Sequence, residues 1–319
     1  MRPFDGLHCE TVATGTLLLA EGIELSEAML FGLGEGLGFV FLNLSSLPLP
    51  FVGGRVKPFE LTRSLAKNLG LTLEELQTTS RKKGWESLER VLSGGRPAGL
   101  QLDCFYLDYF ENAPHFAGHC VAAYHLDDSQ VWVVDTRPQG TLQRVSRESL
   151  EDARHAKGPM AARARQWTLH AQRTLRPIEQ CIATAIRSTA AAFLQPAFGG
   201  ASYRGMDKLA KSLPRWIDAK PEDRMLAAML MERGGTGGAL FRNLYRDFLS
   251  EAIDLLPSRK ALRAARDEFA ASAECWTHIA GLVEESARRD SSAPLSAAAD
   301  KCRGAAAMER RAMECLQRL

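Results

Sequence analysis

The sequence has almost no excess of charge. Its 319 residues include 40 basic and 38 acidic side chains, which gives a formal net charge of +2. A protein that binds nucleic acid or an anionic membrane by electrostatic attraction carries a clear basic excess. We therefore expect neither nucleic acid nor a membrane surface among the partners of this chain.

The cysteines do not form CxxC pairs. The seven cysteines are spread along the chain at Cys9, Cys104, Cys120, Cys181, Cys275, Cys302 and Cys315. This spacing does not match that of a metal-binding finger. An odd, dispersed set is typical of reduced thiols in a cytoplasm, so we expect neither a disulfide framework nor a metal site.

Long apolar runs are also lacking. The longest, residues 39–51, is interrupted by polar residues and prolines, whereas a transmembrane helix needs about 20 apolar residues in succession. Residues 1–20 carry an acidic residue in the middle and lack the basic-then-apolar order of a secretory signal. The expected location is the cytoplasm.

The composition changes once along the chain. Residues 1–172 mix short apolar runs, glycines and helical periods, whereas residues 173–319 are almost wholly helix-forming. Pro177 suits the first turn of a new helix just past this boundary. We predict an α+β protein with a cysteine domain at 1–172 and an all-α helical bundle at 173–319. The Ala-rich faces of the last two helices suit packing in the bundle or against a partner helix, so a homo-oligomer is one possible form of the protein.

Cys9 stands at the mouth of an expected helix. Residues 10–21 are apolar and helix-compatible, and Gly22 is a suitable C-cap. A thiol at a helix N-terminus faces unpaired N–H groups and the positive end of the helix dipole. Both favour the thiolate, so Cys9 is a candidate nucleophile. The alternative is a small buried apolar residue, which is the commonest fate of a free cysteine.

Residues 115–136 are expected to form a β-hairpin. Two apolar strands flank a turn of suitable residue types at residues 127–129. If the turn is centred near residue 128, His119 falls opposite residue 137, and Asp135 sits one diagonal step from His119 on the same face. A carboxylate in that position can hold an imidazole in one tautomer and stabilise its protonated form.

Cys9, His119 and Asp135, in this chain order, are the parts of a papain-type nucleophilic site. The imidazole draws the proton from the thiol, and the ion pair attacks a carbonyl or thioester carbon. His8 adjoins the nucleophile and is assigned a supporting, substrate-binding role. A zinc site built from His8, Cys9, His115 and His119 is an alternative, but the chain lacks regular metal-ligand spacing.

Two glycine-rich segments raise the question of phosphate binding. Residues 32–38 follow a helix and precede a strand, which is the reverse of a dinucleotide loop, so we favour a tight turn there and keep Gly36 as a candidate substrate contact. Residues 234–238 separate two helices, and Thr236 and Gly237 are candidate contacts for an anion such as a phosphate group of a substrate. A tight antiparallel turn is the alternative for this segment, and it is the one we favour.

Several of these segments carry a family resemblance. In the first half they are residues 8–13, 25–39, 115–119 and 133–136, and in the second half residues 234–252. The first set resembles the N-terminal domain of butirosin biosynthesis protein H, which is similar to C39 peptidase-like (papain-like) cysteine proteases. The second resembles the helical DUF4872-type region that accompanies it, so the resemblance spans nearly the whole chain.

The resemblance implies an acyltransferase. Such an enzyme takes an aminoacyl chain from the phosphopantetheine arm of an acyl carrier protein onto a cysteine, and passes it to an amine of an aminoglycoside-type natural product. Carried over to this sequence, Cys9 is the nucleophile, His119 the base and Asp135 the orienting residue. The expected partners are an acyl carrier protein and a small-molecule amine, and no cofactor is expected beyond the arm of the donor.

One departure concerns the oxyanion hole. Papain-type sites commonly place a glutamine several residues before the cysteine, whereas residues 1–8 contain none. The Cys9 N–H and a second, unidentified donor must serve instead. The acyl group and the acceptor stay unspecified. A hydrolase (thioesterase or peptidase) or a cyclase using the same three residues is the alternative, and a non-catalytic binding or scaffold protein is an alternative of another class.

Overall fold

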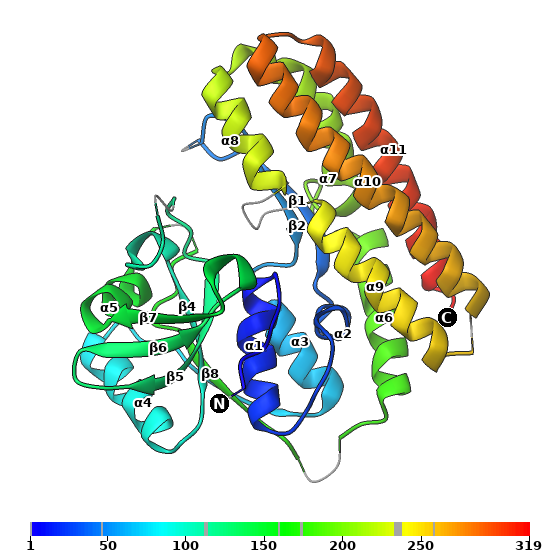
Figure 1. Cartoon of the computed structure of the whole chain (residues 1–319). Helices are drawn as coiled ribbons and strands as arrows, with labels where there is room; N and C mark the ends of the chain where they lie inside the picture. The colour runs from blue at the N-terminus through cyan, green and yellow to red at the C-terminus, as the bar shows by residue number, and fades with distance from the viewer. Residues whose placement is uncertain are drawn as a thin grey trace. The chain divides into compact units, whose positions relative to one another are not determined.

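The computed structural model describes residues 2–45, 47–111, 114–158, 160–172, 175–232, 238–257 and 259–319 (Figure 1). The chain divides into two compact units, and the α+β class is confirmed: one unit is built on a sheet and the other is mainly helical. The first unit comprises residues 1–30 and 57–176, and the second comprises residues 31–56 and 177–319. Residues 31–56 thus join the helical unit, whereas the sequence-based boundaries placed them in the first domain.

A six-stranded antiparallel sheet forms the centre of the first unit. In spatial order its strands are β3 (Thr72–Leu76), β8 (Gln166–His170), β4 (Ala98–Leu102), β5 (His119–Leu126), β6 (Gln130–Val134) and β7 (Leu142–Ser146). Strand β5 alternates its side chains between two covered faces, so its first five residues are all buried. A strand that is covered on both faces needs apolar residues at successive positions, which explains the continuous apolar run in this part of the sequence.

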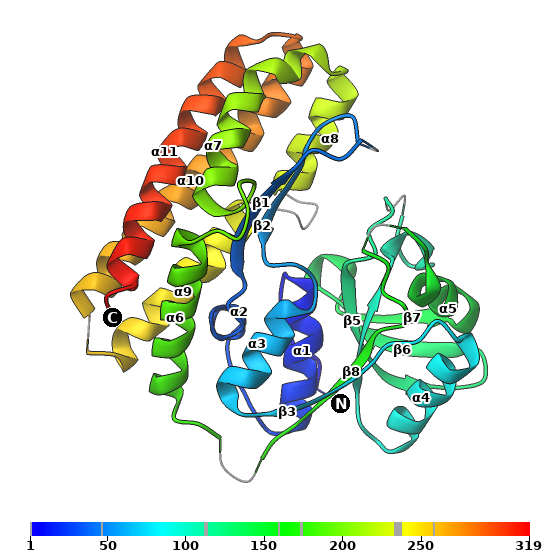
Figure 2. The same ribbon diagram turned by 180° about the vertical axis from the view of Figure 1, so that it is seen from behind.

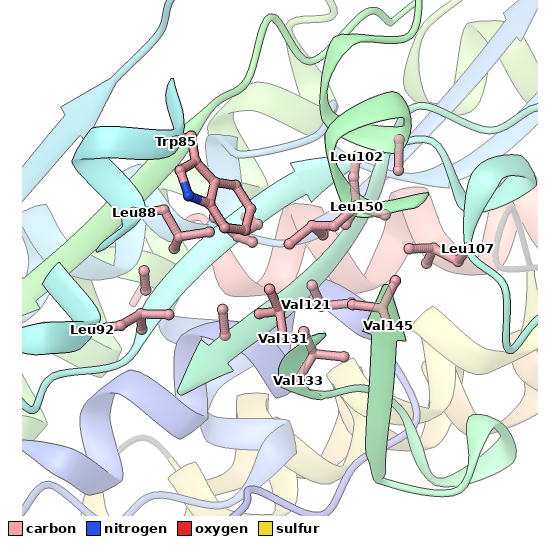
Figure 3. Close-up of a cluster of buried hydrophobic side chains, with 14 of the residues drawn as sticks. Trp85, Leu88, Leu92, Leu102, Leu107, Val121, Val131, Val133, Val145 and Leu150 are labelled. Carbon is pink, nitrogen blue, oxygen red and sulfur yellow. The ribbon is translucent and has the colours of Figure 1, made fainter. Parts of the chain in front are cut away.

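Helices cover both faces of this sheet (Figure 1). They are α1 (Cys9–Ala20), α3 (Glu60–Leu69), α4 (Arg81–Ser93) and α5 (Arg147–His155), and α2 (Glu27–Leu33) begins in the same unit. Figure 3 shows the core between the sheet and the helices α4 and α5, where Trp85, Leu88 and Leu150 meet Val121 and Val133. Helix α1 packs against β5, which brings the N-terminus of a helix to the end of a central strand.

The predicted hairpin and its register are confirmed. Ala122 pairs with Val134 and Ala123 with Val133, so residue numbers of partners sum to 256 beside the site. Near the turn the register shifts by one residue. Asp127 caps the turn, because its carboxylate accepts hydrogen bonds from the N–H groups of Ser129 and Gln130.

The helical spacing of Leu76, Leu88 and Leu92 predicts a helix over residues 73–94, and this prediction is wrong in its first third. Residues Thr72–Leu76 form β3, which pairs with β8, and α4 begins only at Arg81. Ser80 is the N-cap, because its side chain accepts a hydrogen bond from the Lys83 N–H. The glutamates of β3 favour a helix locally, but the backbone pairing with β8 decides the conformation.

In the described part of the second unit, six α-helices accompany a two-stranded sheet. The helices are α6 (Ile178–Leu194), α7 (Ser202–Ser212), α8 (Pro221–Glu232), α9 (Ala239–Leu255), α10 (Arg259–Arg289) and α11 (Ala293–Leu316), and a 3-10 helix (Leu213–Asp218) follows α7. The strands β1 (Leu37–Leu42) and β2 (Phe51–Arg55) are antiparallel, and β1 meets the start of α7 through a bridge between Val40 and Ala201 (Figure 2). No helix in the described part of the chain is both long and apolar enough to cross a membrane.

Candidate active site

Cys9 is the first residue of α1, as predicted to within one residue. His8 is the N-cap in an extended conformation (φ −103°, ψ 124°), and the thiol of Cys9 is buried. The N–H groups of a first helical turn have no intrahelical acceptor, so they point toward the space in front of the thiol. The N–H of Cys9 belongs to this first turn, so it is a candidate donor to an oxyanion.

The surroundings of Cys9 lower the pKa of its thiol well below the ordinary value. The largest cause is a hydrogen bond from the Cys120 side chain. Burial raises the pKa of Cys9. The hydrogen bond from Cys120, a hydrogen bond and the positive charge from His119, and a smaller effect of His8 together outweigh burial. A lowered pKa makes the thiolate, which is the nucleophilic form, available at neutral pH.

His119 and Asp135 meet at the open end of the hairpin. His119 is the first residue of β5, and Asp135 immediately follows β6. Nε2 of His119 lies 2.8 Å from Oδ2 of Asp135, and the two side chains are 10% and 0% exposed. With Nε2 bonded to the carboxylate, Nδ1 is the imidazole nitrogen that can serve Cys9.

The His119 pKa is raised well above that of an ordinary imidazole. Burial alone lowers the pKa of His119, but the charge and hydrogen bond of Asp135, followed by those of Cys9, outweigh it. The opposite shifts of the Cys9 and His119 pKa values both favour the same state, a thiolate beside an imidazolium. The three residues predicted from the sequence are thus brought together with complementary electrostatics.

Tyr109 completes the environment of Asp135. Its hydroxyl donates a 2.7 Å hydrogen bond to Oδ2 of Asp135, and the N–H of Thr136 donates to Oδ1 at 2.6 Å. The ring of Phe110 meets the His119 imidazole edge-on, with ring centres 5.4 Å apart. Burial and the Asp135 charge raise the Tyr109 pKa well above its ordinary value, so the hydroxyl stays protonated as a donor. Sequence reasoning missed Tyr109, although the concentration of aromatic residues at 105–110 was a signal.

Glu27 holds the loop that precedes the nucleophile. Its Oε1 atom accepts hydrogen bonds from the N–H of Leu7 (2.9 Å), the N–H of His8 (2.8 Å) and the hydroxyl of Thr11 (2.8 Å). Gly6 packs so closely here that a Cβ atom would lie 2.8 Å from the same Glu27 oxygen. This role of Glu27 could not be predicted from the sequence, because only the folded loop brings Glu27 beside His8.

The segment after Asp135 is tied to the same loop. Arg137 donates its N–H to the Gly6 carbonyl at 2.9 Å, and its guanidinium pairs with the Asp5 carboxylate at 2.8 Å. The loops that end at Cys9 and begin at Asp135 therefore support each other. This arrangement limits independent movement of the thiol and the carboxylate.

The four candidate substrate contacts lie in different parts of the chain. The His8 side chain is only 3% exposed, beside Cys9. Gly36 lies in the second unit, in a turn where its N–H donates to the Phe31 carbonyl and its carbonyl accepts from the Val56 N–H. Thr236 and Gly237 lie outside the described residues. Their substrate-binding roles all stay predictions, and among the described residues no group of three or more His, Cys, Asp or Glu side chains is arranged to hold a metal ion.

Comparison with protein families accounts for most of the chain. Residues 8–136 match the family described as butirosin biosynthesis protein H, N-terminal, and residues 148–316 match the domain of unknown function DUF4872. The chain belongs to the butirosin biosynthesis protein H-like family, with both domains. The N-terminal match of this family contains Cys9, His119 and Asp135 and ends one residue after the last of them. No curated protein matches the chain significantly.

The family boundary does not coincide with the division of the structure. The DUF4872 match begins at residue 148, within α5, whereas the first compact unit continues to residue 176. Helix α5 and strand β8 thus belong to the sheet unit although the second family match covers them. Family membership itself suggests an enzyme of the acyltransferase kind.

Proposed function

We propose that this protein is a cysteine-dependent acyltransferase. The observation that carries the proposal is the buried set of Cys9, His119 and Asp135, in which the pKa shifts of the thiol and the imidazole both favour a thiolate–imidazolium pair. A thiolate prepared in this way is suited to attack on a thioester carbon. Membership of the butirosin biosynthesis protein H-like family supports acyl transfer in natural-product biosynthesis.

In the first half-reaction the Cys9 thiolate attacks the carbonyl carbon of an acyl or aminoacyl thioester. The bond between that carbon and the sulfur of the phosphopantetheine arm breaks, and the departing thiolate takes the proton of the His119 imidazolium. The N–H of Cys9 donates a hydrogen bond to the oxyanion of the tetrahedral intermediate. The product is acyl-Cys9 beside a neutral His119.

In the second half-reaction an amine attacks acyl-Cys9. Its nitrogen forms the amide bond, its proton passes to His119, and Cys9 leaves as a thiolate, which restores the starting ion pair. Asp135 orients the imidazole and stabilises its charge in both steps. In this proposal an acyl carrier protein is the donor, a small-molecule amine is the acceptor, no further cofactor is needed, and the reaction takes place in the cytoplasm.

The test is the mass of the intact protein after incubation with a carrier protein charged with an aminoacyl thioester. Wild type and Cys315→Ala, which removes an exposed thiol, are expected to gain the mass of one acyl group. Cys9→Ala is expected to gain none, and His119→Ala to gain it at least a hundredfold more slowly, within the range of general acid–base effects.

Equal labelling of wild type and Cys9→Ala would contradict the proposal and favour a non-catalytic binding protein. The fate of the acyl group separates transfer from hydrolysis. Added amine diverts it from the free acid in a transferase and leaves the free acid unchanged in a hydrolase. A cyclised product released without added amine identifies a cyclase.

A further inference from the structure

A second imidazole–carboxylate pair lies in the connection between β4 and β5. Nδ1 of His115 is 3.0 Å from Oδ2 of Asp103, the residue that directly follows β4. The Asp103 side chain is 4% exposed, whereas that of His115 is 60% exposed. A buried carboxylate therefore fixes a histidine whose ring is open to solvent, and the proposed acyl transfer leaves this pair without a role.

The Asp103 carboxylate determines which nitrogen of His115 carries hydrogen. A carboxylate only accepts hydrogen bonds, so Nδ1 is the protonated nitrogen, and in the neutral imidazole Nε2 is an acceptor. The other oxygen of Asp103 accepts the N–H groups of Phe105 (3.1 Å) and Phe116 (2.8 Å), which fixes the carboxylate itself. The pair thus presents an acceptor atom together with a nearby negative charge.

Aromatic rings adjoin this imidazole. Phe105 stacks on His115 with ring centres 3.9 Å apart, and Tyr106 meets both rings edge-on. Phe105 and Tyr106 are 49% and 37% exposed, although residues of this size and polarity are usually well covered. The faces of aromatic rings attract cations, and an ammonium group satisfies both the rings and the Nε2 acceptor.

This cluster lies beside the candidate active site in the same unit. Leu102 pairs with His119 across β4 and β5, so Asp103 is one step beyond the partner of His119. The thiol of Cys104 has its pKa raised to about 11, mainly by burial, and the charges of Asp103, Cys9 and Asp135 add to this while that of His119 opposes it. Asp103 and the three candidate site residues therefore all lie close enough to Cys104 for their charges to affect its pKa.

We propose that His115, Phe105 and Tyr106 form the subsite that binds the acceptor, which carries at least two amines: one is protonated and binds here without reacting, and another, neutral amine attacks acyl-Cys9. Nε2 of His115 accepts a hydrogen bond from the ammonium group, and the exposed rings contact the cation and the apolar part of the acceptor. This assignment rests on the proposed acyl transfer, for which it names the acceptor site.

Asp103→Asn gives a sharp test because it preserves the packing of the loop. The amide oxygen of Asn still accepts the N–H groups of Phe105 and Phe116, while its NH2 group donates to Nδ1 of His115. The imidazole hydrogen then moves to Nε2, which becomes a donor and repels an ammonium group. A loop held only for structural reasons would tolerate this change.

The assay uses an aminoacyl N-acetylcysteamine thioester as donor and kanamycin as acceptor. Asp103→Asn and His115→Lys are expected to raise the KM for kanamycin roughly tenfold or more, which corresponds to about 1.4 kcal/mol, while the rate of acyl-Cys9 formation stays within twofold of wild type. His125→Lys introduces the same charge on the hairpin, where His125 packs against Trp132, and is expected to leave this KM unchanged.

Two results would overturn the subsite: a KM for kanamycin that is unchanged in both variants, or a fall in acyl-Cys9 formation as large as the fall in transfer. If wild type forms no acyl-Cys9, the proposed function fails, and calorimetric binding of kanamycin still tests the subsite. Weaker binding by Asp103→Asn than by wild type then supports it, and equal binding overturns it.

Discussion

The hydroxyl of Tyr109 donates a 2.7 Å hydrogen bond to Oδ2 of Asp135, the same oxygen that accepts Nε2 of His119. Asp135 is fully buried, so its carboxylate depends on these two donors and on the Thr136 N–H in place of water. Tyr109 thus completes the hydrogen bonding of a charge that the imidazole alone would not satisfy.

Replacing Tyr109 with Phe is therefore expected to reduce both stability and reactivity. Loss of a hydrogen bond to a buried charge lowers the free energy of unfolding by about 1–3 kcal/mol. Acylation of Cys9 is expected to slow by roughly tenfold as Asp135 becomes free to turn away from His119. Urea unfolding and the rate of acylation measure the two effects. The control is Tyr124→Phe, at a partly exposed tyrosine of β5; an equal loss in the control would contradict the role given to Tyr109.

The charge of His119 is expected to govern how the reactivity of Cys9 depends on pH. The thiol pKa is lowered by the hydrogen bond from Cys120 and then by His119, so the thiolate persists in mildly acidic solution. His119→Gln removes the imidazolium and shifts the thiol pKa upward, toward about 8.5 for an ordinary cysteine.

The measurement is the rate of alkylation by iodoacetamide between pH 5 and 10. At pH 6 the rate of His119→Gln is expected to be at least tenfold below that of wild type, because a raised pKa leaves less thiolate. The two rates should converge above pH 9, where both thiols are ionised. Superimposable profiles would mean that His119 does not act on the Cys9 thiol.

Two substitutions of Glu27 can separate its effect on the position of the loop before Cys9 from the effect of its negative charge. Glu27→Ala removes the acceptor of the Leu7 and His8 N–H groups, so the loop before Cys9 shifts and acylation is expected to fall about 10- to 100-fold. Glu27→Gln keeps an oxygen acceptor and removes a negative charge near Cys9, so acylation should change less than threefold while the thiol pKa falls slightly.

Rates of acyl-Cys9 formation and iodoacetamide pH profiles distinguish these two Glu27 variants. Glu24→Gln is the matched control, since Glu24 forms an exposed ion pair with Arg2. If the Gln variant is as slow as the Ala variant, the charge of Glu27 matters and the positioning argument fails.

The buried ion pair of Arg242 and Glu309 predicts a large loss of stability on substitution. Both side chains are 0% exposed, and the guanidinium makes two bonds to the carboxylate, at 2.8 and 2.9 Å. Arg242→Met leaves the buried Glu309 carboxylate with Ser272 and Trp276 as its remaining donors among the described residues, which is expected to lower the unfolding free energy by about 3–5 kcal/mol.

Urea unfolding measures the effect of Arg242→Met. Arg246→Met, four residues along α9, removes an arginine that is 35% exposed and pairs with neighbouring Asp247, and it is expected to change stability by less than about 1 kcal/mol. Equal losses in the two variants would contradict the special role of the buried pair.

Local sequence patterns predicted the site residues that lie on or next to helices and strands. The hairpin was predicted from two apolar runs on either side of a turn at residues 127–129, and its register placed Asp135 one diagonal step from His119. The helical spacing of Phe241, Tyr245 and Phe248 predicts an apolar stripe on α9, and all three side chains are buried. The periodicity of a single element was sufficient in these cases.

Contacts between distant segments could not be read in this way. Arg242 lies off the apolar stripe of α9, which predicts a solvated side chain. That prediction is wrong, because Arg242 is buried and donates hydrogen bonds to Glu309 and to the Gly54 carbonyl, both distant in the sequence. Tyr109 and Glu27 likewise acquire their roles only through residues 26 and 19 positions away. Sequence alone does not indicate which of many polar residues will meet a buried partner.

Arg242 donates a hydrogen bond to the Gly54 carbonyl, so the helical unit cannot be cut out of the chain as one continuous fragment with all its contacts. Because residues 31–56 belong to the helical unit, the chain passes between the units three times, at residues 30/31, 56/57 and 176/177. A fragment that starts at residue 177 lacks Gly54 and also lacks Phe39, whose ring lies 5.4 Å from that of Trp276. A single crossover within the gene therefore cannot exchange one unit and leave the other whole.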